Sequence, residues 1–124
     1  MRWLALALVG CGGGAIPCTV DGGGPSFASD VQPILAARCD GVECHRATWG
    51  GANGYARLVD VVAPECTDGR LLVAPGSPST SYLIEKVRGV DLCQGVQMPK
   101  VGPPLTDAQF QTLSDWICAG AAND

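Results

Sequence analysis

Two cysteines and the only histidine of the chain lie together at Cys39-Asp-Gly-Val-Glu-Cys44-His45. Two cysteines followed directly by a histidine are the pattern of c-type haem attachment. In that pattern both thiols bond the porphyrin vinyl groups, and the adjacent imidazole ligates the iron. Four residues separate the cysteines here, whereas two separate them in the usual pattern. The run therefore predicts a haem site of a less common form.

Two other interpretations of Cys39 and Cys44 stay open at this point. The wider spacing also suits a local disulfide that closes a tight loop. Thiolate ligation of a metal is a third interpretation, but structural zinc sites usually combine two close pairs of Cys or His ligands. No second pair stands at metal-ligand spacing elsewhere in the chain.

Met98 is the residue that best supplies a second iron ligand. Haem iron that carries electrons needs a strong ligand on each face, and histidine with methionine is a common pair. Met98 is the only methionine apart from Met1, and it stands beside Pro99 in a loop rich in proline and glycine. Methionine ordinarily fills cores, a role that suits a helix face better than this loop. The sequence predicts Met98 as the distal ligand.

The cysteine content and the N-terminus indicate export. Seven cysteines in 124 residues are typical of an oxidising compartment. One arginine, an apolar run and Leu8-Val9-Gly10-Cys11 resemble a bacterial lipoprotein signal. We therefore expect residues 1–10 to be a signal peptide, and Cys11 to carry the lipid that anchors a periplasm-facing or surface lipoprotein of the cell envelope. The run is far too short to span a bilayer. The alternative is an ordinary apolar N-terminus with a buried cysteine.

Composition and charge limit the class of protein. A chain of 124 residues forms at most one domain. The net charge of −4, without any basic cluster, argues against nucleic-acid binding. The 17 glycines and 9 prolines predict short elements in much irregular backbone. A small domain of this kind often depends on a disulfide or a cofactor for stability.

The pattern along the chain predicts an all-α domain at residues 26–124 behind a flexible, glycine-rich tether at 11–25. Ser77 is the expected cap of one helix with Pro78 in its first turn, and Thr106 with Gln109 forms a capping box for the last. We expect residues 71–74 to form a short extended run. We expect about four short helices, at residues 26–38, 55–62, 77–88 and 106–119. The first of them should end at the first cysteine.

The remaining cysteines suggest disulfides. Cys66 and Cys93 flank the predicted helix 77–88, so a bond between them would join its two connecting loops. Cys18 and Cys118 are then left, and they could tie the tether to the last helix. The alternative is a buried, reduced Cys118. Four cysteines allow three pairings, so these pairs are preferences.

Several short pieces in a fixed order carry a resemblance to a known family. With these pieces, residues 26–123 resemble the small class I cytochrome c domains of myxobacterial and planctomycete lipoproteins. The pieces are Asp30-Val-Gln-Pro-Ile-Leu, Cys39 to Cys44-His45, Pro75-Gly-Ser-Pro-Ser-Thr-Ser-Tyr82-Leu, Met98-Pro99, Gly102-Pro-Pro-Leu and Trp116-Ile-Cys-Ala-Gly-Ala.

The resemblance implies a cytochrome c-like fold in which the first and last helices pack together around haem c. Cys39 and Cys44 would be the thioether residues, His45 the proximal ligand and Met98 the distal ligand. The expected function is electron transfer by an exported monohaem carrier that is not itself an enzyme and that meets unidentified redox partner proteins. Two alternatives remain: a disulfide-stapled extracytoplasmic lipoprotein that binds a ligand without haem, and a subunit of a redox enzyme encoded elsewhere.

Overall fold

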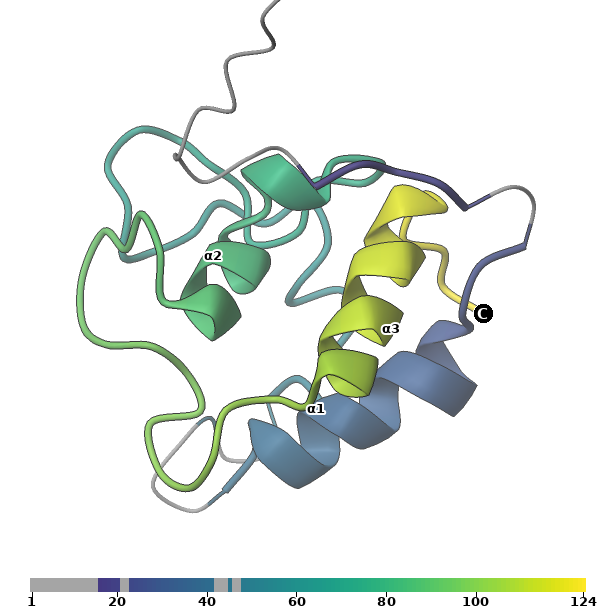
Figure 1. Ribbon diagram of the computed structural model, residues 1–124, viewed down its shortest axis with the longest axis horizontal. Coiled ribbons are helices and arrows are strands. Elements are labelled where there is room, and N and C mark those ends of the chain that lie inside the picture. Colours follow the sequence, from purple (N-terminus) through teal and green to yellow (C-terminus); the bar gives the residue numbers. More distant parts are fainter. Residues whose placement is uncertain (1–15, 21–22, 42–44, 46–47) are drawn as a thin grey trace, which may run out of the picture.

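The protein is built from short helices joined by long loops (Figure 1). The computed structural model describes residues 16–20, 23–41, 45 and 48–124. Within these ranges there is no strand, and the only extended pairing consists of two isolated bridges. The all-α prediction is thereby confirmed. In chain order the helices are the π-helix η1 (Phe27–Val31), α1 (Gln32–Arg38), the 3-10 helix η2 (Pro78–Thr80), α2 (Tyr82–Arg88) and α3 (Asp107–Cys118).

The N-terminal helix forms where the sequence predicts it. The Ser26 side chain accepts a hydrogen bond from the backbone N–H of Ser29 and so caps η1. Pro33 lies in the first turn of α1, directly after η1, where its fixed φ suits the helix. The helix ends at Cys39, whose N–H still bonds the carbonyl of Leu35. The first cysteine of the motif is therefore attached to the end of a helix.

Helix α3 provides the centre of the core. Thr106 and Gln109 form the predicted capping box at its start. Trp116 is fully buried, and its ring lies 5.4 Å from that of Phe27 on η1. Figure 1 shows α3 lying beside the N-terminal helix, and their apolar faces share one cluster. The members of that cluster from these two segments include Phe27, Val31, Leu35, Leu113, Trp116 and Ile117.

The helix predicted at residues 55–62 is wrong. Residues 52–58 form turns, and Val59 and Val62 then make bridges to Val73 and Leu71. The N–H of Asp60 bonds the carbonyl of Val73 at 3.0 Å, and Asp60 itself has a left-handed φ of 59°. From Asp60 on, pairing with the segment at 71–73 thus takes the place of the local hydrogen bonds of a helix.

The predicted helix 77–88 is divided at Ser81. Ser81 is extended (φ −91°, ψ 118°) and separates η2 from α2. Its buried hydroxyl donates to the Ser77 carbonyl at 2.8 Å and accepts from the N–H of Ala74 at 2.9 Å. The Ser77 side chain makes no cap bond, so that part of the prediction is wrong. Gly89 ends α2 in the left-handed conformation (φ 71°), as expected for a C-terminal glycine.

Both expected disulfides are present, Cys66–Cys93 and Cys18–Cys118. The second joins the predicted tether to the end of α3. Ile16 also packs against the core and donates its N–H to the Ser79 hydroxyl at 2.8 Å. Residues 16–20 are therefore held against the domain. The predicted signal peptide and Cys11 lie outside the described residues. In the part of the chain that is described, no helix is long and apolar enough to cross a membrane.

Candidate functional site

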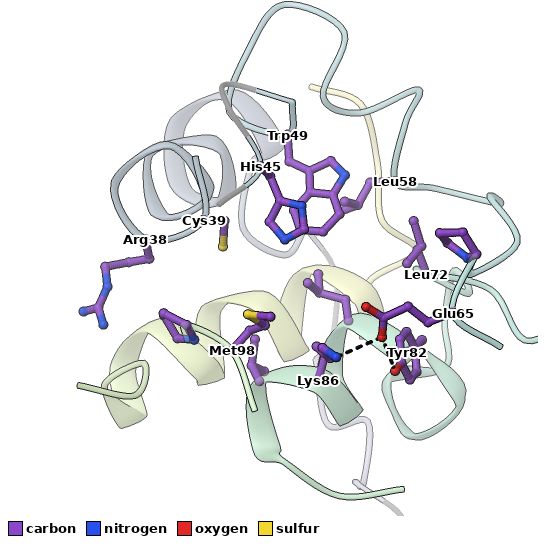
Figure 2. Close-up of a pocket in the computed structure, with 14 residues that line it drawn as sticks. Arg38, Cys39, His45, Trp49, Leu58, Glu65, Leu72, Tyr82, Lys86 and Met98 are labelled. Atoms are coloured by element: carbon purple, nitrogen blue, oxygen red, sulfur yellow. Dashed lines mark hydrogen bonds and ion pairs between the residues drawn. The ribbon is translucent and has the colours of Figure 1, made fainter. Parts of the chain in front are cut away.

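One pocket brings together three of the residues expected to hold haem. Cys39, His45 and Met98 all line it, whereas Cys44 lies outside the described residues. Figure 2 shows the His45 ring and the Met98 side chain on opposite sides of the pocket. The space inside, including the part that opens to solvent, is about 850 Å³. Most of the remaining lining is apolar and includes Leu58, Leu72, Leu83 and Val87.

His45 is held by a local turn and by an aromatic neighbour. The backbone N–H of His45 donates to the Cys39 carbonyl at 3.1 Å, and the backbone carbonyl of His45 accepts from the N–H of Thr48 at 3.0 Å. The imidazole stacks on Trp49, with ring centroids 3.8 Å apart and an angle of 30° between the planes. The stack fixes the direction in which His45 faces the pocket.

The segment after His45 is attached closely to α1. The carboxylate of Asp40 accepts from the N–H groups of Trp49 (3.2 Å) and Gly50 (2.6 Å). The Gln32 amide donates to the Gly50 carbonyl at 3.0 Å. A side chain at position 50 would place its Cβ 2.6 Å from the Cα of Ala36, so only glycine permits this approach. The helix thereby positions Trp49, and Trp49 positions His45.

Burial lowers the pKa of His45, because a charged imidazolium loses hydration in the pocket. The carboxylates of Asp40 and Glu65 act in the opposite direction, and the ammonium of Lys86 adds a smaller lowering. The net result favours the neutral ring at neutral pH. A neutral imidazole has the unprotonated nitrogen that metal ligation requires.

Met98 is held through its backbone at the end of α2. Its N–H donates to the carbonyl of Lys86 at 2.9 Å, and the Gln97 amide donates to the carbonyl of Val87 at 2.9 Å. The last carbonyls of a helix lack intrahelical partners, so these bonds satisfy groups that would otherwise need water. The side chain of Met98 is half-buried at the pocket.

A polar corner closes one end of the pocket. The Glu65 carboxylate accepts from the Lys86 ammonium at 2.8 Å and from the Tyr82 hydroxyl at 2.7 Å. These contacts are drawn in Figure 2. The hydrogen bond from Lys86 is the largest cause that lowers the pKa of Glu65. The carboxylate of Glu65 is therefore charged at neutral pH.

Sequence reasoning assigned no role in the site to Trp49, Glu65 or Lys86. Tyr82 and Lys86 stand four residues apart on α2, a spacing that places both on one side of a helix. That spacing was the available signal for two members of the polar corner. Glu65 and Trp49 come from loops, whose placement depends on distant contacts.

In the described ranges, no group of three or more His, Cys, Asp and Glu side chains could hold a metal ion. No protein-family model matches the chain, and comparisons with curated proteins and with solved structures also found no match. What the protein does is therefore inferred from the residues of the pocket.

Proposed function

We propose that the protein is an exported monohaem cytochrome c with a class I-like fold, anchored through a lipid on Cys11, which transfers single electrons. The observation that carries the proposal is the pairing of His45 and Met98 on one apolar pocket that also contains Cys39. A nitrogen and a thioether sulfur on opposite sides of a cavity are the donor set that electron-carrying haem uses.

The pocket residues also fit the rest of the group. A porphyrin is a flat, largely apolar plate, and this pocket has mostly apolar walls, as cofactor sites usually do. Cys39 lines it at the end of α1 and is followed closely along the chain by Cys44. The packing of the N-terminal helix on α3 supports the expected class I arrangement.

Haem c, when bound, would supply an iron that alternates between its ferric and ferrous states. The residues of the chain determine how that chemistry is used. Cys39 and Cys44 would hold the group covalently. His45 and Met98 would both ligate the iron and so leave no place on it for a substrate, while Leu58, Leu72 and the other apolar walls would exclude water.

The two disulfides fit an oxidising compartment. This agrees with export to the cell envelope, where the lipid on Cys11 would provide the membrane contact. The partners would be redox proteins, and the negative charge of the chain favours basic surfaces on them.

The decisive experiment is expression with a c-type maturation system, followed by acid-acetone extraction and a reduced-minus-oxidised spectrum. We expect the haem to stay with the protein after extraction, because thioether bonds survive it. His45→Ala should prevent assembly of the normal spectrum. Protein without covalent haem, together with a Cys39–Cys44 disulfide found by mass spectrometry, would contradict the proposal and favour the disulfide-stapled binding lipoprotein.

Met98→Ala tests the axial assignment separately. We expect it to keep the covalent haem but to lose the red-region charge-transfer band of sulfur-ligated ferric haem. Its reduction potential should fall by on the order of 100 mV, because methionine ligation raises the potential. Val101→Ala is the matched control, since Val101 lies in the same loop, is 66% exposed and does not line the pocket. An unchanged band and potential in Met98→Ala would remove Met98 from the site.

A further inference from the structure

The loop that carries Met98 has no regular structure of its own. We call residues 89–105 the Met98 loop; all of them are described, and none belongs to a helix or a strand. Near Met98 it is tied to α2 by the bonds of Met98 and Gln97. After Met98, the Arg38 guanidinium donates to the carbonyls of Pro103 and Pro104.

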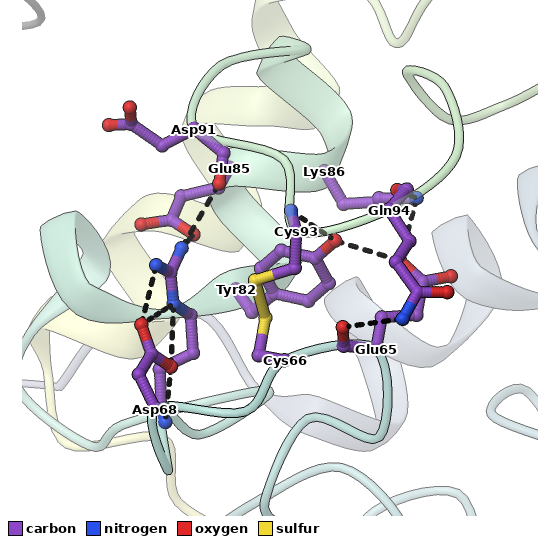
Figure 3. The surroundings of a disulfide bond; sticks show 10 residues. Glu65, Cys66, Asp68, Tyr82, Glu85, Lys86, Asp91, Cys93 and Gln94 are labelled. Atoms are coloured by element: carbon purple, nitrogen blue, oxygen red, sulfur yellow. Dashed lines mark hydrogen bonds and ion pairs between the residues drawn. A yellow bond between two sulfur atoms is a disulfide. The ribbon is translucent and has the colours of Figure 1, made fainter.

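The Cys66–Cys93 disulfide ties the loop on the other side of Met98. Cys66 belongs to a turn in which its N–H bonds the Ala63 carbonyl at 3.1 Å. Cys93 lies in the Met98 loop, so the bond joins this loop directly to the segment that contains Glu65 (Figure 3). The disulfide is therefore the covalent contact between the Met98 loop and the polar corner of the pocket.

Hydrogen bonds around the disulfide fix the same junction. The N–H of Cys93 donates to the Tyr82 hydroxyl at 3.2 Å, and the Gln94 amide donates to the Glu65 carbonyl at 3.1 Å. The Lys86 ammonium donates to the carbonyl of Gln94 at 2.7 Å. Figure 3 shows these bonds together on one side of the disulfide, beside Glu65 and Lys86. Cys93 and Gln94 are thus placed against α2 and against Glu65.

This junction limits where Met98 can go. Five residues of extended chain span at most about 17 Å, so a fixed Cys93 about halves the reach of Met98, which lies ten residues beyond the end of α2 at Arg88. Without the disulfide, the loop would be held covalently only by α2 and α3 at its two ends, and the hydrogen bonds of Cys93, Gln94 and Met98 alone would have to place it. Holding the Met98 side chain at the pocket would then cost more conformational entropy than it does with the disulfide in place, because the freer loop has more conformations to lose.

We infer that the Cys66–Cys93 disulfide is a positioning device for Met98, which keeps its sulfur at the pocket opposite His45. The inference deepens the proposed function and rests on it wherever haem is the readout. The other disulfide offers a contrast, because neither Cys18 nor Cys118 lines the pocket, and Cys118 ends α3.

The test compares Cys66→Ser/Cys93→Ser with Cys18→Ser/Cys118→Ser, both produced with a c-type maturation system. In the first variant we expect covalent haem to remain and the sulfur-to-iron band to fall about tenfold or more, with exchange of the Met98 amide about tenfold faster or more. The amide of Val73, which bonds the Leu58 carbonyl, should keep its protection relative to wild type. The second variant should keep the band, although its disulfide closes the longer loop, with a sequence separation of 100 against 27.

The inference is overturned if the band persists in Cys66→Ser/Cys93→Ser, or if both double variants lose it equally. A Gly-Gly insertion after Gly95 serves if the first variant does not fold, because it keeps the disulfide but lengthens its connection to Met98. It should weaken the band, whereas the same insertion after Gly23 should not. Wild-type protein without haem would contradict only the proposed function, and exchange of the Met98 amide would then decide the inference.

Discussion

His45 and Met98 are held on the pocket in different ways. The imidazole of His45 stacks on Trp49. Met98 is placed through its backbone, and its unbranched side chain has several rotatable bonds. The histidine side is therefore preorganised, whereas the methionine side depends on the position of its loop. This difference explains why the contacts of the Met98 loop matter for the proposed electron carrier.

The Glu65–Lys86 pair should make the stability of the protein depend on pH. The pKa of Glu65 is lowered below the ordinary value of 4.5, first by the hydrogen bond from Lys86. The stabilisation from this group is complete above that value and is lost as the pH falls through the lower pKa of the folded state. The free energy of unfolding should therefore fall between about pH 7 and pH 3.5 in both proteins, and it should fall further in the wild type than in Glu65→Gln. We expect the extra loss to be about 0.2–1 kcal/mol, because the pair is partly exposed.

The measurement is the free energy of unfolding in urea at both pH values. Lys86→Gln should shrink the same pH difference, because it removes the main cause of the lowered pKa. An equal loss of stability in the wild type and in Glu65→Gln would show that the pair contributes nothing.

At the scale of elements, each helix end sets the course of a functional segment. The end of α1 presents Cys39, and the end of α2 provides the carbonyl that holds Met98. The start of α3 follows the Met98 loop directly. Its capping box therefore determines where that loop must finish.

Thr106→Ala tests the capping box. We expect it to lower the free energy of unfolding by about 1 kcal/mol, because the N–H of Gln109 loses its partner at the first turn. Thr112→Ala is the matched control within the same helix. The Thr112 hydroxyl bonds only the Ala108 carbonyl one turn back, a bond that adds little to helix stability. Urea unfolding that finds equal losses for both variants would contradict the role of the cap.

At the scale of the whole molecule, the apolar core and the pocket share the same helices. Leu83 and Val87 of α2 belong to the core cluster and also line the pocket. The two disulfides connect different regions of the molecule. Cys18–Cys118 joins the N-terminal segment to α3. Cys66–Cys93 joins the segment that contains Glu65, one wall of the pocket, to the Met98 loop.

Features that depend on residues close together in the chain were predictable from the sequence. The capping box of Thr106 and Gln109 acts within one turn of the chain, so neighbouring residues determine it. The candidate ligands Cys39, His45 and Met98 were recognisable by residue type, because few side chains have their chemistry. Their role with haem stays a prediction.

Only the tertiary structure decided the features that depend on distant partners. Val59 and Val62 pair with Val73 and Leu71. The buried hydroxyl of Ser81 divides a helix that local propensity would have continued. Trp49 and Glu65 reach the site because Asp40 and the Lys86–Tyr82 pair attract groups from loops. Such contacts follow from packing and charge pairing across the fold, which no spacing along the chain encodes.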